Sequence, residues 1–443
     1  MNARAIHRSL AWVAGLVAVF WAATGFLHPI MSSSAPRPAV QAPPPATAPL
    51  AGVRTPTGLP AAARLLRLVE FETRPYWQAV ESNGEIRAAD AVTGAAAPDL
   101  PAQRAIALAR YYAGLGVDVA ATAVRIDRLS SQYPPVNKLL PVWEVRFATQ
   151  DGLALYVEPG ADRLAMTTND QRRVLLALFQ NIHTMKFLEG IEPLRLAVIT
   201  ALVGSVLVTT LFGIVMLVGA RGRGMRLWHR TIGWIAAPVA LAFAISGLFH
   251  LFATASLSQM AAPTATAFNV SRVAAMPRLE GVIRADVSIG ADSNGSPLWR
   301  VLPEGASSAI YFDLEGRALA IDDATRARRL ARAPDDAPVV DVTGFGADYG
   351  FINKRLPVVR VGEGAGAMFV DLREGLVAAS AASGVRAYEE WFFDTIHKWE
   401  PVADAIGRRN RDYLTMAAVA LIAVMASFGL GLAVSRRKRG EVR

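Results

Sequence analysis

The segments HRSLAWVAGLVAVFWAATGFLH, residues 7–28, and HRTIGWIAAPVALAFAISGLFH, residues 229–250, decide the fold of this chain. Each is an apolar stretch with a histidine at either end, and nine of their 22 aligned positions are identical. A helix that crosses a bilayer needs about 20 apolar residues, so both segments predict membrane spans. Two later stretches are also long and apolar enough. We therefore expect a helical membrane bundle of four spans, at residues 1–30, 194–220, 229–252 and 413–435.

The composition is that of a membrane protein with substantial water-facing parts. Of the 443 residues, 53% are hydrophobic and only 19% are charged. That balance is too apolar for an ordinary soluble protein and too polar for a bundle of spans alone. The chain contains no cysteine. Disulfides, covalently attached haem, cysteine-ligated iron–sulfur clusters and cysteine nucleophiles are therefore excluded, and any metal or haem must use other side chains.

The positive charges predict how the chain is oriented. The formal net charge is +9, and the excess lies in basic clusters beside the predicted spans, near residues 4–8, 221–230 and 436–443. Such clusters mark the cytoplasmic side of a membrane. Both termini and the 221–228 loop are then expected to be cytoplasmic, while residues 31–193 and 253–412 face the other side, which for a bacterial chain is the periplasm. This distribution does not indicate a nucleic-acid surface.

Similarity between the two halves of the chain extends beyond these spans. FQNIHTMKF, residues 179–187, resembles FFDTIHKWE, residues 392–400, and the segments that begin at Val136 and Ile352 are also similar. Because its twin is internal, the first span is expected to be retained, not cleaved as a signal peptide. Two pseudo-symmetric halves with the same orientation predict a two-fold axis along the membrane normal. The repeat matches all six histidines, as His7 with His229, His28 with His250, and His183 with His397.

The segments between the spans predict α+β domains that follow a linker. Residues 31–62 are rich in proline and alanine and are expected to be a poorly ordered linker. Residues 63–193 and 253–412 each contain alternating strand-like runs, glycine turns and a helical stretch, so each predicts a small domain of antiparallel sheet and helix. Neither segment contains a phosphate-binding loop, a nucleophile elbow, a paired-histidine zinc motif or a dinucleotide fingerprint.

The histidines are candidate ligands. His7 and His28 are 21 residues apart, which on a helix is a rise of about 31 Å, or one bilayer core. Histidines occur at span ends as interfacial side chains, but imidazoles inside a bundle are costly unless they have partners. No clustered acids accompany them as in zinc sites, which favours haem iron between opposed imidazoles. Small residues nearby would leave room for a macrocycle: Gly15, Thr24, Gly25, Ser246 and Gly247.

These motifs resemble the PepSY-associated transmembrane family of bacterial inner-membrane proteins, which includes iron-regulated proteins and ferric-siderophore reductases. The resemblance rests on the two histidine-bounded spans, on IHTMKF and IHKWEP, and more loosely on PepSY-like strand hairpins. It implies PepSY-like periplasmic domains and a haem-b membrane reductase. Electrons would pass from a quinol or a cytoplasmic reductase to a periplasmic ferric siderophore or another Fe(III) chelate.

We therefore predict an electron-transfer protein of the inner membrane with two b-type haems. His7 and His229 are expected to bind the cytoplasmic-side haem, with Arg8 and Arg230 near its propionates. The periplasmic candidates are His28, His250, His183 and His397. The outer haem could be bound by His28 with His250, by His183 with His397 or by a cross-pairing of these, and a third haem is also compatible with four histidines. Four aromatic residues are expected near that outer site: Phe179, Phe187, Trp391 and Trp399. Two alternatives are a membrane-anchored PepSY sensor or peptidase inhibitor, and a metal transporter that uses the histidines.

Overall fold

The computed structural model divides the chain into two compact units, one helical and one built mainly of β-strands. The helical unit comprises residues 1–35, 171–260 and 382–443, and the β unit comprises residues 36–170 and 261–381. Parts of the predicted cytoplasmic loop and tail, residues 221–222 and 441–443, lie outside the described residues. The structure describes residues 3–217, 223–256, 263–346, 348–380 and 384–440.

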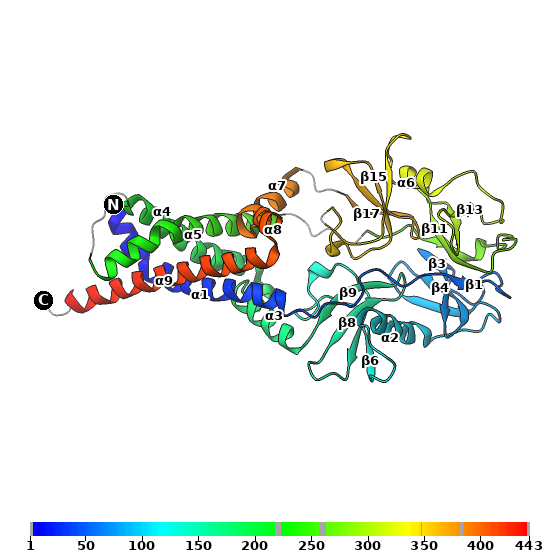
Figure 1. Cartoon of the computed structure of the whole chain (residues 1–443), viewed down its shortest axis with the longest axis horizontal. Helices are drawn as coiled ribbons and strands as arrows, with labels where there is room; N and C mark the ends of the chain where they lie inside the picture. Colours follow the sequence, from blue (N-terminus) through cyan, green and yellow to red (C-terminus); the bar gives the residue numbers. More distant parts are fainter. Residues whose placement is uncertain (1–2, 218–222, 257–262, 347, 381–383, 441–443) are drawn as a thin grey trace. The chain divides into compact units, whose positions relative to one another are not determined.

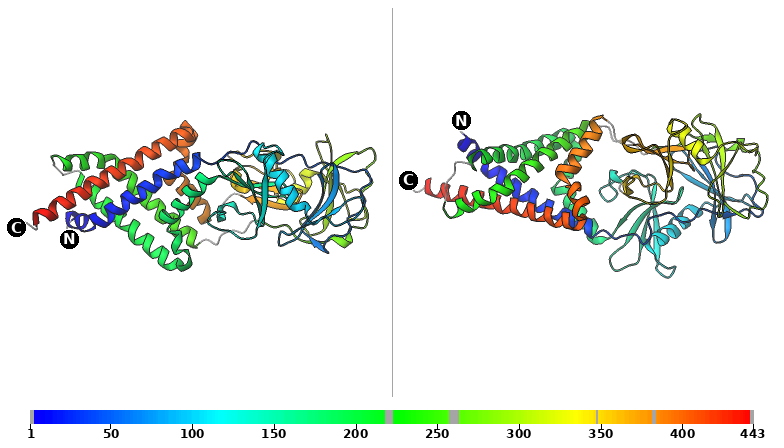
Figure 2. Two further views of the ribbon diagram at one scale, coloured as in Figure 1. Left: turned by 90° about the horizontal axis from the view of Figure 1, so that it is seen from below. Right: turned by 45° about the horizontal axis from the view of Figure 1, so that its top comes forward.

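Four long helices form the body of the helical unit (Figures 1 and 2). Helices α1 and α5 each pack against both α4 and α9, so α1 and α5 lie on one diagonal of the bundle. Within the described residues these four helices are long and apolar enough to cross a membrane, which confirms the predicted number of spans. Their bounds are α1 (Ala3–Ser33), α4 (Glu192–Leu217), α5 (Met225–Ser256) and α9 (Arg408–Gly440).

The middle of this bundle is packed with small residues. Ala22 on α1 and Ala236 and Ala240 on α5 are buried together with Val419 and Ile422 on α9. Alanine at a helix interface lets the backbones approach closely, which is how helices associate in a lipid environment. The histidines of α1 and α5 lie toward the two ends of this alanine-rich layer.

Shorter helices precede α4 and α9, and the remaining two histidines lie where helical segments end, His183 directly after α3 and His397 at the end of a π-helical turn. Helix α3 (Asp170–Ile182) leads through a 3-10 turn, η2 (Lys186–Ile191), into α4. Met185 and Trp399, each two residues after a histidine, have positive φ angles of 51° and 57°. This left-handed conformation turns the chain sharply after each histidine. On the second path lie α7 (Gly384–Phe392), the π-helical turn η6 (Phe393–His397) and α8 (Glu400–Ile406).

The centre of the β unit is one antiparallel sheet to which both interspan segments contribute. Its strands follow the order β13-β12-β11-β3-β4-β5, and β1 pairs with one end of β11. Strands β3 and β11 meet in the middle, with Leu66 opposite Ile289 and Arg67 opposite Ser288. The strand bounds are β1 (Ala48–Pro49), β3 (Leu65–Phe71), β4 (Arg74–Val80), β5 (Ile86–Asp90), β11 (Arg284–Ala291), β12 (Pro297–Pro303) and β13 (Ile310–Phe312).

Two four-stranded antiparallel sheets complete the β unit, each with one helix packed on it. The first contains β6 (Ala121–Ile126), β7 (Val142–Phe147), β8 (Ala154–Glu158) and β9 (Arg163–Thr168), and is covered by α2 (Leu100–Ala113). The second contains β14 (Val339–Val342), β15 (Val358–Val361), β16 (Met368–Asp371) and β17 (Leu376–Ser380), and is covered by α6 (Asp323–Ala331). Short strands β2 (Ala62–Ala63) and β10 (Phe268–Asn269) form a separate pair.

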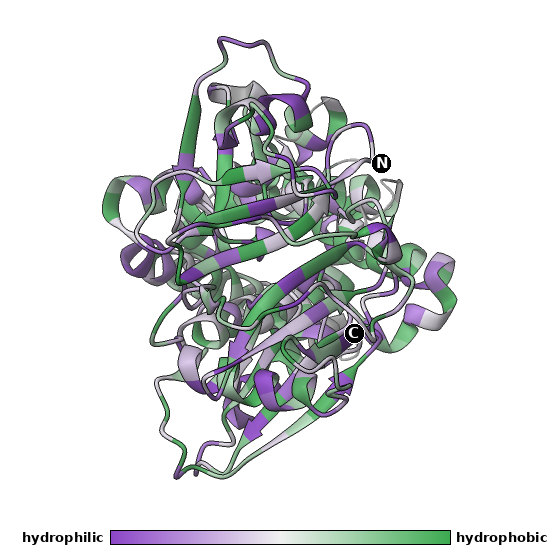
Figure 3. Ribbon diagram, turned by 90° about the vertical axis from the view of Figure 1, so that its right-hand side faces the viewer, coloured by the Kyte–Doolittle hydropathy of each residue, from purple (hydrophilic) through white to green (hydrophobic). Residues whose placement is uncertain are grey.

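The core of the β unit is centred on two tryptophans from different interspan segments. Trp77 on β4 and Trp299 on β12 are fully buried, and their rings meet edge to face with centroids 5.8 Å apart. Edge-to-face packing of this kind adds roughly 1 kcal/mol beyond the burial of apolar area. Hydrophilic and hydrophobic residues alternate along several strands (Figure 3), as expected for sheets with one face in the core.

The structure differs from the sequence-based organisation in two respects. First, the proline-rich segment is not a free linker: Ala48 and Pro49 form β1, and the Ala39 N–H donates to the Tyr112 carbonyl. Pairing with existing secondary structure satisfies its backbone, which composition does not reveal. Second, the two interspan segments do not form separate domains, because they share the central sheet, and the chain from Gln171 belongs with the spans.

Candidate functional site

His7 and His229 meet inside the helical bundle. They come from the diagonal helices α1 and α5, and their ring centroids are 6.4 Å apart with an interplanar angle of 54°. This is the pair that the repeat matches at the first histidine of each span. Two imidazoles at this separation, one from each of two opposed helices, form the inner histidine layer.

Each inner imidazole is held by a backbone carbonyl of the next long helix of the bundle along the chain, α4 for His7 and α9 for His229. Nδ1 of His7 lies 2.8 Å from the Thr209 carbonyl oxygen on α4, and Nδ1 of His229 lies 2.9 Å from the Met425 carbonyl oxygen on α9. A carbonyl only accepts, so Nδ1 carries the proton and donates. The lone pair is then on Nε2, which is the arrangement found for metal-binding histidines oriented by a second hydrogen bond.

A glycine makes room for each of these contacts. A Cβ atom built on Gly213 of α4 would lie 3.2 Å from Cε1 of His7, and one on Gly429 of α9 would lie 3.1 Å from Cε1 of His229. Both glycines follow the accepting carbonyl by four residues. The imidazole therefore approaches the helix over a position without a side chain. The sequence analysis missed these glycines, although the spacing of Thr209 and Gly213 repeats in Met425 and Gly429.

His183 and His397 are held in a related way by hydroxyl groups. Nδ1 of His183 is 2.8 Å from Thr24 Oγ1 on α1, and Nδ1 of His397 is 3.0 Å from Ser246 Oγ on α5. Each hydroxyl also donates to a carbonyl of its own helix. The Thr24 hydroxyl lies 2.9 Å from the Trp21 carbonyl oxygen, and the Ser246 hydroxyl lies 2.8 Å from the Ala242 carbonyl oxygen. The hydroxyl proton is used there, so the oxygen accepts from the imidazole N–H. Nε2 again carries the lone pair.

Both of these imidazoles are neutral at physiological pH. Burial, together with nearby His28, lowers the pKa of His183 to about 4. Burial is also the main cause that lowers the pKa of His397 to about 3, and His183, His250, His28 and Lys398 contribute the rest of that shift. Neutral imidazole is the form that binds a metal. The mutual electrostatic effects also place the four outer histidines within one neighbourhood, the outer histidine layer.

A phenyl ring contacts both outer histidines of each half. Phe393 stacks on His250 with centroids 3.9 Å apart and on His397 with centroids 4.6 Å apart, and all three planes are nearly parallel. Two imidazoles cannot share one face of a phenyl ring at these distances, so Phe393 lies between them and keeps His250 from His397. Phe179 stacks on His183 at 4.7 Å, but its ring is tilted by 56° to the ring of His28, at 5.2 Å.

The two halves differ beside His28 and His250. Nδ1 of His250 contacts a carboxylate oxygen of Glu389 on α7, and Glu389 is buried. The residue at the matching position of the first half is Leu175. The charges within electrostatic range of His28 are Arg411, Asp412 and Lys398. The sequence analysis did not identify Glu389, although the unequal residues at positions 175 and 389 are visible once the histidines are aligned.

The other predicted residues have mixed placements. Arg8 is exposed, and Arg230 is half-buried beside His229. Phe179 stacks on His183, and Trp399 stacks on Phe243 at 5.8 Å, whereas Phe187 and Trp391 are 68% and 59% exposed. Gly15 was expected to leave room for a macrocycle, but a Cβ atom there would lie 2.8 Å from Leu430. Its role is helix packing, because the α9 side chain fills that space.

The separation of the inner pair matches that of two imidazoles that bind one iron ion from opposite sides. In the described part of the chain no group of three or more histidine, aspartate or glutamate side chains is arranged to hold a metal ion. An iron bound on both faces by imidazole, with bonds of about 2 Å, places the ring centroids about 6 Å apart. The separation of His7 and His229 is 6.4 Å. Both residues carry the lone pair on Nε2, as such binding requires.

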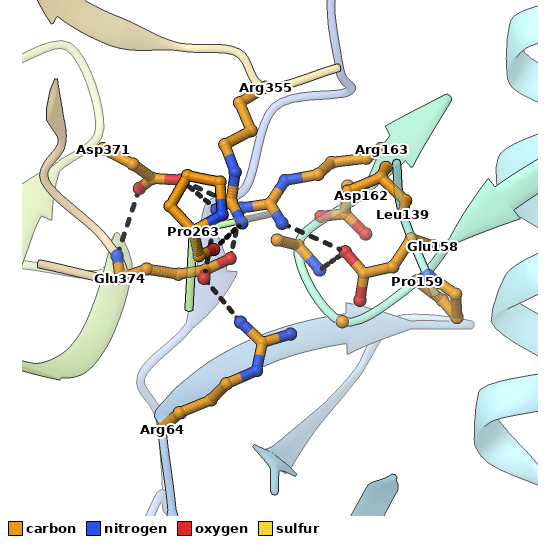
Figure 4. Close-up of polar contacts among 12 residues, drawn as sticks. Arg64, Leu139, Glu158, Pro159, Asp162, Arg163, Pro263, Arg355, Asp371 and Glu374 are labelled. Atoms are coloured by element: carbon orange, nitrogen blue, oxygen red, sulfur yellow. Dashed lines mark hydrogen bonds and ion pairs between the residues drawn. The ribbon is translucent and has the colours of Figure 1, made fainter. Parts of the chain in front are cut away.

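The β unit contains a second cluster of titratable residues, the arginine network (Figure 4). Glu374 has no exposed surface and pairs with Arg64 at 2.5 Å, with Arg355 at 3.1 Å and with Arg163. Burial would raise the pKa of Glu374, but these guanidinium groups hold it well below its usual range. Asp371 pairs with Arg163 at 2.9 Å. Because its charges are buried and paired with one another, this network joins the two interspan segments and is structural.

Comparisons with known proteins add no relative. No family model, no curated protein and no solved structure matches this chain. The function must therefore be argued from the residues described above.

Proposed function

We propose that this protein is a haem-b electron-transfer protein of a membrane that reduces Fe(III) chelates. The observation that carries the proposal is the shared hydrogen bonding of four histidines, which form two matched pairs. In each of the four, Nδ1 donates to an acceptor on a membrane-spanning helix, and the lone pair is on Nε2. An interfacial histidine needs no such arrangement, whereas an iron ligand does.

We assign His7 and His229 to the inner haem and His183 and His397 to the outer haem. The inner assignment rests on the 6.4 Å separation of the ring centroids. The outer assignment rests on the matched hydroxyl contacts of Thr24 and Ser246. The pair His250 and His397 is disfavoured by the intervening ring of Phe393. The pair His28 and His250 is disfavoured because the two imidazoles have unlike surroundings.

The chain's own groups would set how the haems behave. The Thr209 and Met425 carbonyls orient the inner imidazoles, and the hydroxyls of Thr24 and Ser246 orient the outer ones. The alanine-rich middle of the bundle keeps water away from the region between the layers. A bound haem supplies a one-electron carrier at each layer.

The remaining parts of the proposal rest on the sequence. The basic clusters beside the spans support a topology in which both termini are cytoplasmic and the β unit is periplasmic, as for a protein of a bacterial inner membrane. The repeat of spans and histidines supports two pseudo-symmetric halves, and the motifs resemble the PepSY-associated transmembrane family. The substrate would be a ferric siderophore or a similar chelate in the periplasm. Reduction would release iron because such chelators bind Fe(II) more weakly.

A visible absorption spectrum of the protein purified in detergent from haem-replete cells tests the proposal. We expect a Soret band and α-bands that sharpen on reduction with dithionite. His7→Ala and His229→Ala should each remove about half of the haem, and adding His183→Ala should remove the rest. For variants that fold poorly, His229→Gly with added imidazole should recover the spectrum. A colourless wild-type protein would exclude the proposal and favour a sensor, a peptidase inhibitor or a transporter.

Chelate reduction is tested separately. The dithionite-reduced protein, freed of excess reductant, is mixed with a ferric hydroxamate in the presence of a ferrous-specific chromophore. We expect the haem to reoxidise as the ferrous complex appears. A haem that remains reduced would leave an electron carrier with a different acceptor.

A further inference from the structure

His250 and Glu389 form a polar pair that the proposed haem ligation does not use. The Glu389 side chain is 7% exposed, the His250 side chain is 39% exposed, and Nδ1 of His250 contacts Oε1 of Glu389. When the carboxylate accepts a hydrogen bond from the Nδ1–H group, Nε2 of His250 is left as a hydrogen-bond acceptor. Among the described residues, no hydrogen bond reaches that nitrogen.

The pair is connected to the outer haem ligand by stacked rings. Phe393 lies against His250 at 3.9 Å and against His397 at 4.6 Å, with interplanar angles of 16° and 15°. A redox-active ligand that bound to Nε2 of His250 would therefore be separated from the haem ligand His397 by one imidazole and one phenyl ring. That contact gives a short route for an electron.

Only one half of the protein has this pair. His28 matches His250, but Leu175 matches Glu389, and two cations, Arg411 and Lys398, lie within electrostatic range of His28 together with Asp412. A carboxylate behind an imidazole stabilises the imidazolium that forms when the imidazole takes a proton. Cations oppose it. The halves thus agree in the groups that would hold haem and differ in the one place suited to accept a proton.

We propose that His250 and Glu389 form the binding site of a hydroquinone from the lipid phase, which is the electron donor of this protein. The inference rests on the proposed haem function. A hydroquinone is apolar enough to reach a half-exposed group on a membrane helix, and its hydroxyl group donates to a neutral imidazole nitrogen. The sequence left two possible electron donors, a quinol and a cytoplasmic reductase, and this site favours the quinol.

The reaction balances with these groups. The hydroquinone O–H bond would break, its proton would go to Nε2 of His250, and one electron would be taken up by a haem held at His397, which supplies a one-electron acceptor when bound. The imidazolium, paired with the Glu389 carboxylate, then loses its proton to the outer aqueous phase. Repetition of this step removes the second proton and electron and leaves the quinone. Two haems suit this donor, because a two-electron reductant must deliver to an acceptor that takes one electron at a time.

The decisive experiment compares two reductants of the haem-loaded protein. Decylubiquinol should reduce the wild-type haem in stopped-flow absorbance measurements. Glu389→Leu, which copies the first half, should slow this reduction by roughly 10²-fold, the usual contribution of a positioned proton acceptor. Dithionite should reduce wild type and variant equally. The matched control is Glu390→Gln, which removes an exposed carboxylate from the adjacent position of α7 and should change the decylubiquinol rate by less than twofold.

Binding is measured without turnover, by quenching of tryptophan fluorescence with decylubiquinone. Glu389→Gln keeps the size of the side chain and removes its charge, and it should bind the quinone within threefold of wild type yet reduce slowly with decylubiquinol. His250→Leu should weaken binding at least tenfold. The inference is overturned if wild-type haem is reduced by dithionite but not by decylubiquinol, or if Glu389→Leu and Glu390→Gln behave alike. Absence of a haem spectrum would instead contradict the proposed function itself.

Discussion

The histidine layers of the helical unit and the arginine network of the β unit bury polar groups in opposite ways. His183 and His397 are neutral, and each uses one ring nitrogen for a hydrogen bond to a spanning helix. Glu374 and its arginines are charged and pair with one another. A neutral ring held at one nitrogen keeps a lone pair for chemistry, whereas a charge satisfied from several sides does not. The comparison separates a candidate reactive site from a structural one.

The largest effect is expected in the arginine network. Glu374→Gln leaves Arg64, Arg163 and Arg355 without their common partner, so the free energy of unfolding of the β unit should fall by about 3–5 kcal/mol. Denaturant unfolding followed by tryptophan fluorescence measures this, since Trp77 and Trp299 are buried in the same unit. The matched control is Glu315→Gln, whose exposed ion pair with Arg317 should contribute less than 1 kcal/mol. Equal effects of the two substitutions would show that the network is not structural.

Acid should remove part of the same stabilisation. Burial raises the pKa of Glu374, but Arg163, Arg355 and Arg64 lower it more, so its folded pKa is depressed. A depressed carboxyl pKa contributes stability that is complete above the unfolded pKa of about 4.3 and is lost as pH falls through the folded pKa. The difference in unfolding free energy between wild type and Glu374→Gln should therefore be constant from pH 7 to pH 5. It should shrink by about 2 kcal/mol or more in strong acid. A difference that shrinks between pH 7 and pH 5 would contradict this origin.

The acceptors of the outer histidine layer should affect haem binding without affecting the fold. Thr24→Val and Ser246→Ala remove the groups that accept from Nδ1 of His183 and His397, so each should weaken outer haem binding about 10- to 100-fold. Haem titration of the apoprotein measures this change. Ser205→Ala on α4 is the control, because among the described residues that hydroxyl donates to the Leu202 carbonyl of its own helix and not to a histidine. An unchanged haem affinity in both acceptor variants would leave the hydroxyls with no role in ligation.

The smallest effect is expected at the glycines of the inner layer. Gly213→Ala and Gly429→Ala each place a Cβ atom 3.1–3.2 Å from an imidazole carbon, so the ring must shift by a few tenths of an ångström. We expect a several-fold loss of inner haem affinity and an altered midpoint potential, as small changes in ligand orientation produce. Gly204→Ala is the control on α4, where a Cβ atom would meet nothing within 4 Å. Identical potentials in all three variants would mean that the glycines do not position the histidines.

Much of the fold follows from local patterns in the sequence. The four helices follow from apolar length, and strands such as β4 and β12 follow from alternation and turns around Trp77 and Trp299. The shared central sheet does not follow. Its middle pairing joins Leu66 to Ile289, and no local pattern specifies a partner more than 200 residues away. For the same reason the sequence divides the β unit into two domains.

The candidate site shows the same division. The six histidines and their pairing by the repeat are visible in the sequence because alignment needs no coordinates. The sequence marks Thr24 and Ser246 as small residues that leave room for a macrocycle, but it does not show that they contact His183 and His397. Glu389 is likewise one of several acids until its contact with His250 is known.

The sequence by itself determined which segments are apolar enough to span a membrane and which histidines correspond. Both are properties of short stretches, since burial in lipid and helical periodicity act on neighbouring residues. Only the tertiary structure decided which atoms meet. It set the 6.4 Å between His7 and His229, put Phe393 between His250 and His397, and gave Glu374 its arginines. Hydrogen bonds and ion pairs act over a few ångströms, whereas residues that form them here lie far apart in the sequence, His7 202 positions from Thr209 and Arg64 310 positions from Glu374.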